Sequence, residues 1–80
     1  MQLVETMRDQ NIEVKTFSLD KSELKILGQY FGTKFSSKAH LGVMYYDGEM
    51  LNTLQVNDKF TYDLPYEDAC GLLNINRLVA

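Results

Sequence analysis

The sequence predicts a small α+β domain in which a mostly antiparallel sheet of three to five strands carries one or two helices on one face. Three features indicate this class: a helix with both ends marked near residues 20 and 32, an Asp-Gly turn at residue 47, and apolar–polar alternation elsewhere. The chain has 80 residues, 45% hydrophobic and 24% charged, which is typical of one globular domain spanning residues 1–80.

The first twenty residues contain one clear strand and one ambiguous segment. Residues 11–19 are rich in β-branched and aromatic side chains and alternate at first, which predicts a strand. Residues 1–10 fit a helix through Leu3, Val4 and Met7, and they also fit a strand hairpinned onto residues 11–18. We favour the helix, because the polar run RDQN resembles a helix end more than a tight two-residue turn.

The next segment predicts a helix from residue 21 to residue 31 with a signal at each end. Asp20 is a favourable N-cap, and Glu23, three positions later, completes the pattern of a capping box. Gly32 supplies a residue that accepts the left-handed conformation at the helix end. The apolar face comprises Leu24, Leu27 and Phe31.

The second half of the chain predicts a meander followed by a helix. Strands are expected at 41–46 and 49–54 around the Asp47-Gly48 turn, and again at 59–64. Pro65 precedes a short helix, and residues 75–80 are expected to form a short edge strand. If residues 1–10 are set aside, the order β-α-β-β-α-β is that of a ferredoxin-like fold, and a bent SH3-like sheet with an added helix is the alternative.

Aromatic residues make up 11% of the chain, and some of them must form the core. We expect Phe31, Phe60 and one of the adjacent Tyr45 and Tyr46 to be buried between helix and sheet. Strand alternation places the other member of that pair on the opposite face of the sheet. If helices cover one face only, several tyrosines lie exposed together with Met44 or Met50, which is a composition found at protein interfaces.

Cysteine content and the N-terminal sequence favour a cytoplasmic protein. Cys70 is the single cysteine, so an intrachain disulfide is excluded and a reducing compartment is favoured. The first ten residues contain Glu5, Arg8 and Asp9, which interrupt the apolar core that a signal peptide needs. No stretch approaches the length of a membrane span. We therefore expect a complete intracellular chain that does not associate with membranes.

No arrangement of residues predicts an enzyme, a cofactor or a metal site. His40 and Cys70 are better explained as a loop residue and a small buried side chain than as a nucleophile pair. Gly28 and Gly32 lie at the C-terminal end of the predicted helix instead of at its start, so they do not form a phosphate-binding loop. The spacing of the carboxylates Asp58, Asp63, Glu67 and Asp68 matches no calcium-binding loop.

These exclusions favour a non-enzymatic interaction protein, such as a small inhibitor or regulator that occludes a larger protein partner through an exposed sheet face. A viral origin would suit such a product. The residues expected to bind the partner are Tyr45, Tyr46, Glu49 and Tyr62.

Two alternatives remain open at this stage. The net charge is −3, yet residues 21–40 carry four lysines and one glutamate, so an RNA- or single-stranded nucleic-acid-binding module is the first. It would use Tyr30, Lys34, Phe35 and Lys38. The second is a structural homodimer in which the exposed sheet face or an edge strand pairs with its own copy.

Overall fold

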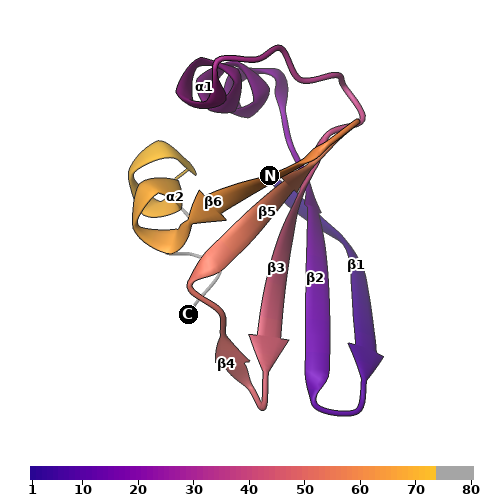
Figure 1. The fold of residues 1–80 in the computed structure, drawn as a ribbon. Coiled ribbons are helices and arrows are strands. Elements are labelled where there is room, and N and C mark those ends of the chain that lie inside the picture. Colours follow the sequence, from indigo (N-terminus) through magenta and orange to yellow (C-terminus); the bar gives the residue numbers. More distant parts are fainter. Residues whose placement is uncertain (74–80) are drawn as a thin grey trace.

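A computed structural model describes residues 1–73, and over these residues an antiparallel sheet of six strands carries two helices (Figure 1). This confirms the predicted α+β class, although the strands outnumber the three to five expected. The elements in chain order are β1 (Gln2–Asp9), β2 (Ile12–Ser18), α1 (Lys21–Phe31), β3 (His40–Tyr46), β4 (Glu49–Met50), β5 (Thr53–Asn57), β6 (Thr61–Pro65) and α2 (Tyr66–Leu73).

The strands follow one another across the sheet in the order β1-β2-β3-β5-β6, and the short β4 pairs with the end of β3. The ferredoxin-like order is not confirmed, because β2 and β3, on either side of α1, are direct antiparallel neighbours. The SH3-like alternative is not confirmed either. The strand expected at 75–80 lies outside the described residues.

The prediction of a helix over residues 1–10 is wrong, because β1 forms a hairpin with β2 along its length. A two-residue turn joins the strands, and Gln10 in this turn has a φ of 54°, which residues other than glycine rarely adopt. Across the hairpin, Arg8 Nε donates a hydrogen bond to a carboxylate oxygen of Glu13. Pairing with β2 therefore overrides the local preference that favoured a helix.

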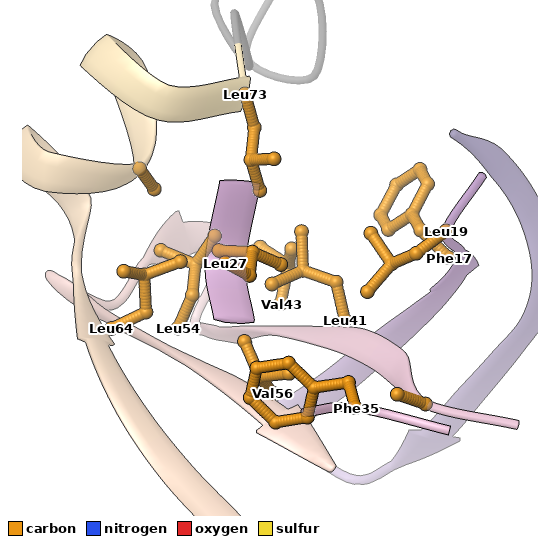
Figure 2. Packing of buried hydrophobic residues seen from close by; sticks show 12 residues of the cluster. Phe17, Leu19, Leu27, Phe35, Leu41, Val43, Leu54, Val56, Leu64 and Leu73 are labelled. Carbon is orange, nitrogen blue, oxygen red and sulfur yellow. The ribbon is translucent and has the colours of Figure 1, made fainter. Parts of the chain in front are cut away.

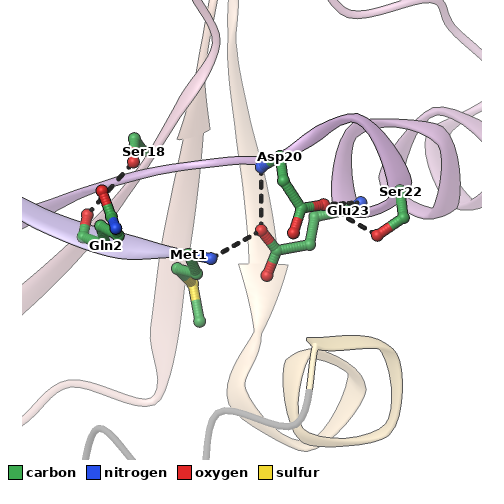
Figure 3. Close-up of polar contacts among 6 residues, drawn as sticks. All are labelled: Met1, Gln2, Ser18, Asp20, Ser22 and Glu23. Atoms are coloured by element: carbon green, nitrogen blue, oxygen red, sulfur yellow. Dashed lines mark hydrogen bonds and ion pairs between the residues drawn. The ribbon is translucent and has the colours of Figure 1, made fainter.

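The predicted ends of α1 are confirmed. Asp20 accepts the backbone N–H of Glu23 at 2.8 Å, and the Glu23 carboxylate accepts the backbone N–H of Asp20 at 2.9 Å (Figure 3). Hydrogen bonds donated to the Asp20 carboxylate, chiefly by the Glu23 backbone N–H and then by the Ser22 hydroxyl, lower its pKa. At the other end Gly32 is left-handed with a φ of 69°, and Thr33 N–H donates to the carbonyl oxygen of Gly28 at 3.0 Å.

The Asp47-Gly48 turn is also confirmed. Asp47 and Gly48 have φ angles of 51° and 81°, the pair of positive values that a type I′ turn requires. The second helix forms as expected after Pro65, and the backbone N–H of Tyr66 at its start donates to the carbonyl oxygen of Asn52 at 2.7 Å. The turn at Asp47-Gly48 and the start of α2 after Pro65 thus lie where the residues around them predicted.

The core lies between the sheet and the two helices (Figure 2). Leu27 of α1 is completely buried and lies among leucines and valines of β3, β5 and β6. Phe31 and Tyr45 are partly buried against this cluster, which agrees with the prediction that one of the adjacent tyrosines packs inward. The buried hydrophobic residues in the described part of the chain are Phe17, Leu19, Leu27, Phe35, Ala39, Leu41, Val43, Leu54, Val56, Leu64, Ala69 and Leu73.

The prediction that Phe60 lies in the core is wrong, since 71% of its surface is exposed. Strand β6 begins only at Thr61, so Phe60 belongs to the preceding bend and lies outside the alternation that turns Tyr62 toward the helices. Tyr62 packs inward instead, with ring centroids 5.2 Å from Phe31 and 5.1 Å from Phe35.

Hydrogen bonds to Asp58 connect the loop between α1 and β3 to the bend between β5 and β6. Asp58 accepts the backbone N–H of Ser36 at 2.9 Å and the Ser36 hydroxyl at 2.7 Å. These donors stabilise the ionised carboxylate, so they lower its pKa, with the Ser36 backbone N–H as the largest cause. The neighbouring Phe35 side chain is thereby held in its buried position.

Replacing Asp58 by asparagine is expected to lower the melting temperature at neutral pH and to reduce its dependence on acid pH. A carboxyl whose pKa is lowered on folding stabilises the fold above its unfolded value of about 4, and this contribution disappears as the pH falls through the lower folded value. Thermal melts between neutral and strongly acid pH test this. Asp63→Asn removes an exposed carboxylate on β6 and serves as the control; equal shifts in both variants would contradict the assignment.

Candidate interaction surface

One face of the sheet, here called the open face, has no helix over it among residues 1–73 (Figure 1). Side chains of a strand alternate between the two faces, so the register determines which ones lie there. Phe17, Leu41 and Val43 point into the core under the helices. Their neighbours along β2 and β3 therefore point to the open face.

Two consecutive cross-strand rows on the open face are apolar. Met7, Val14 and Met44 are paired across β1, β2 and β3, and Ile12 is paired with Tyr46 in the next row toward the hairpin ends. Leu51, which follows β4, lines a groove with Val14 and Met44 and extends this area. We call these side chains the open-face patch: Met7, Ile12, Val14, Met44, Tyr46 and Leu51.

Much of the open-face patch is accessible to solvent. Met7 is 60% exposed, Tyr46 53%, Ile12 43% and Leu51 41%, whereas Val14 and Met44 are half-buried between them. A contiguous apolar area of this kind differs from the single, scattered apolar residues that are usual on an exposed surface.

A groove of about 410 Å³ runs beside the open-face patch. Val14, Met44 and Leu51 form part of its wall, and polar side chains that include Gln55 form another part. Gly42 of β3 also lines the groove, and its lack of a side chain leaves the hollow open between its neighbours on β2 and β5. The surface is thus apolar at one end and carries hydrogen-bonding groups at the other.

The charges on the open face are acidic. Asp9 and Glu49 lie at the two ends of the row formed by Ile12 and Tyr46. No described strand position on this face carries lysine or arginine, because Arg8 and Lys15 alternate to the helix side. The acidic residues on the open face are Glu5, Asp9, Glu49 and Asp63.

The structure brings together two of the four residues predicted to bind a protein. Tyr46 and Glu49 are register partners on the open face, and both are exposed. Tyr45 lies on the helix side, where Lys15 Nζ is 5.1 Å from its ring centroid. Tyr62 lies on the same side, packed against aromatic rings of the core.

Sequence reasoning named Met44 as a candidate for this face, but it did not select Met7, Ile12, Val14 or Leu51. Met7, Ile12 and Val14 belong to the β1–β2 hairpin, and the favoured helix over residues 1–10 removed one strand of that pair from consideration. Part of the signal was present in the strand interpretation, since Ile12 and Val14 alternate with Glu13 and Lys15, whereas residues 5–9 contain a single apolar side chain. Leu51 lies between β4 and β5 and has no such pattern.

The residues of the nucleic-acid alternative do not share one surface. Phe35 is buried, and the Tyr30 hydroxyl donates a hydrogen bond to Asp68 on α2. This bond is the main cause of the raised pKa of Tyr30. Lys34 and Phe35 line one hollow of about 590 Å³ beside α1, together with Lys21 and Lys25, whereas Lys38 borders a different depression near β2 and β3.

Groups suited to catalysis or metal binding are separated or engaged. His40 lies on β3 with its Nδ1 3.3 Å from the carbonyl oxygen of Lys38, and Cys70 lies on α2, which packs on the other side of the sheet. A hydrogen bond with Cys70 is the main cause of the raised pKa of Tyr66. Among residues 1–73, no group of three or more His, Cys, Asp or Glu side chains is placed to hold a metal ion.

Within the described residues, neither helix is long and apolar enough to span a bilayer. No protein-family model, curated protein or solved structure matches the chain. The surface described above is therefore the basis for assigning a function.

Proposed function

We propose that the protein is a non-enzymatic binding protein that docks a partner protein on its open face. The observation that carries this proposal is the open-face patch, an exposed apolar area on the side of the sheet that no described helix covers. Burial of methionine, isoleucine and tyrosine side chains supplies the driving force in such interfaces, and tyrosine is enriched among the residues that contribute most.

The partner that fits this surface presents an apolar centre bordered by lysine or arginine. Glu5, Asp9, Glu49 and Asp63 surround the open-face patch, and no described strand position on the same face offsets them with a cation. Complementary charge at the edge of an interface directs the partner and raises the association rate more than the final affinity. An amphipathic basic helix laid across the strands meets both requirements.

The size of the chain suits an inhibitor or regulator that acts by occlusion. Its two longest dimensions are 35 and 23 Å, so one whole face is comparable to the area of about 800 Å² that each partner contributes to an ordinary stable interface. A partner bound over the open face would have a similar area of its own surface covered. We therefore propose that the protein blocks a functional surface of a larger partner inside the cell.

Tyr46→Ala is expected to weaken binding by about 30-fold, because a central tyrosine in an interface contributes about 2 kcal/mol. The probe is an amphipathic helical peptide of leucine and lysine, titrated into the isotope-labelled protein and followed by amide chemical shifts. The shifts should concentrate on β1, β2 and β3 at the open-face patch, and they should diminish with added salt.

Two controls make this test specific. Phe60→Ala removes an exposed aromatic ring from the bend before β6, and it should leave peptide binding unchanged. A peptide in which glutamate replaces lysine should bind at least tenfold more weakly. If the glutamate peptide binds equally well, or if Phe60→Ala weakens binding as much as Tyr46→Ala, the proposed surface is wrong.

A further inference from the structure

Strand β1 forms a long edge of the sheet that no other described strand covers. Within residues 1–73 it pairs only with β2, and all eight of its residues are exposed. Its apolar side chains Leu3, Val4 and Met7 are 52%, 60% and 60% exposed. Edge strands carry a row of unpaired backbone N–H and C=O groups, which native proteins shield with charged residues, above all lysine, with proline or with bulges. Strand β1 has no lysine or proline, and its shielding is limited to Glu5, Arg8, Asp9 and the bulge between Leu3 and Glu5.

The opposite edge is different. Strand β6 has five residues and ends at Pro65, which lacks an N–H group, and the chain then turns directly into α2. Over the described residues the sheet thus has one short edge that ends in proline and one long edge open to pairing. This asymmetry disfavours an endless array in which β1 of one copy joins β6 of the next.

We infer that β1 pairs with β1 of a second copy, antiparallel and centred on Thr6. A two-fold axis perpendicular to the sheet relates the two copies. Residues opposite each other must therefore point to the same face of the sheet, and this limits the possible registers. If the axis passes through Glu5, the Glu5 side chains of the two copies lie opposite each other. If it passes through Met7, Glu5 of each copy lies opposite Asp9 of the other. Centring on Thr6 places Glu5 opposite Met7 and leaves no like charges directly opposite.

The bulge in β1 limits how far this pairing extends. The register with β2 shifts between Leu3 and Glu5, so regular pairing centred on Thr6 joins Glu5, Thr6 and Met7 of one copy to Met7, Thr6 and Glu5 of the other. Because the axis is perpendicular to the sheet, both open faces lie on the same side of the dimer. The inference does not rest on the proposed function, since pairing along the edge leaves Tyr46 uncovered.

The test is sedimentation of the full chain over a concentration series, together with charge substitutions at the axis. The unaltered chain should show twice its monomer mass. Thr6→Glu places two carboxylates opposite each other, and it should give the monomer mass at concentrations where the unaltered chain is a dimer. Its new side chain lies beside Lys15 of β2, so folding is favoured, and a thermal melt verifies this.

Thr6→Lys should also give a monomer, and an equimolar mixture of Thr6→Glu and Thr6→Lys should restore the dimer mass. Thr61→Glu on β6 is the matched control and should remain a dimer. A monomer at every concentration, a dimer that survives Thr6→Glu, or a mixture that stays monomeric would each overturn the inference. Loss of peptide binding in Tyr46→Ala would leave all of these masses unchanged.

Discussion

Leu27→Ala is expected to lower the free energy of unfolding by about 2–5 kcal/mol, which is the usual cost of removing a fully buried leucine side chain. Leu27 has no exposed surface and lies at the centre of the buried cluster between α1 and the sheet. Domains of this size have a total stability of only about 5–15 kcal/mol, so the variant should be partly unfolded near physiological temperature. Equilibrium unfolding in urea, followed by circular dichroism, measures the change.

Ile26→Ala is the matched control for this prediction. Ile26 is the preceding residue of the same helix, but 36% of its surface is exposed. Its replacement should cost clearly less than that of Leu27, because more than a third of its surface is already exposed and alanine has the higher helix propensity. Equal losses of stability in the two variants would mean that α1 does not pack on the sheet through the face described here.

Gly28→Ala and Gly71→Ala are expected to change stability in opposite directions, although both replace a helical glycine. A Cβ atom at Gly28 would lie 2.6 Å from the carbonyl oxygen of Thr33, so the backbone at the end of α1 would have to move. Such crowding costs about 1–3 kcal/mol, which exceeds the gain in helix propensity of about 1 kcal/mol. The net result should be a less stable protein.

At Gly71 in α2 a Cβ atom would meet no atom of another element of residues 1–73 within 4 Å. The alanine variant should therefore be more stable by about 0.5–1 kcal/mol, since it gains helix propensity without strain. Urea unfolding of both variants beside the unaltered chain provides the measurement. A gain of stability in Gly28→Ala would show that the end of α1 is looser than the contact with Thr33 indicates.

The features that could be predicted from the sequence are those determined by residues close together in the chain. The two ends of α1 follow from Asp20, Glu23 and Gly32, and the β3–β4 turn follows from Asp47-Gly48. In each case a side-chain hydrogen bond or a positive φ angle is satisfied within a few residues. These local requirements leave few alternatives.

The features that were missed depend on distant parts of the chain. Strand β1 is defined by its partner β2 and by a turn in which Gln10 takes an uncommon φ angle. Phe60 matches the alternation of the following strand, yet the bend before Thr61 removes it from the sheet.

The candidate surface could be predicted only in part, because its side of the sheet depends on register. Alternation separates Tyr45 from Tyr46, but it does not say which of them the helices cover. A shift of one residue would exchange the two faces. The register of β3 with β2 and β5 determines which of the two tyrosines the helices cover, and it places Tyr46 on the open face.

The isolation of β1 at the edge has a consequence for the internal motions of the protein. None of its side chains belongs to the buried core, so the strand can detach from β2 without exposing the interior. In the monomeric Thr6→Glu variant, where no second copy pairs with β1, the amide protons of this strand should therefore exchange with deuterated solvent sooner than those of β3 and β5. The monomer then opens in two stages: β1 detaches first, and the amide protons of β3 and β5 exchange later.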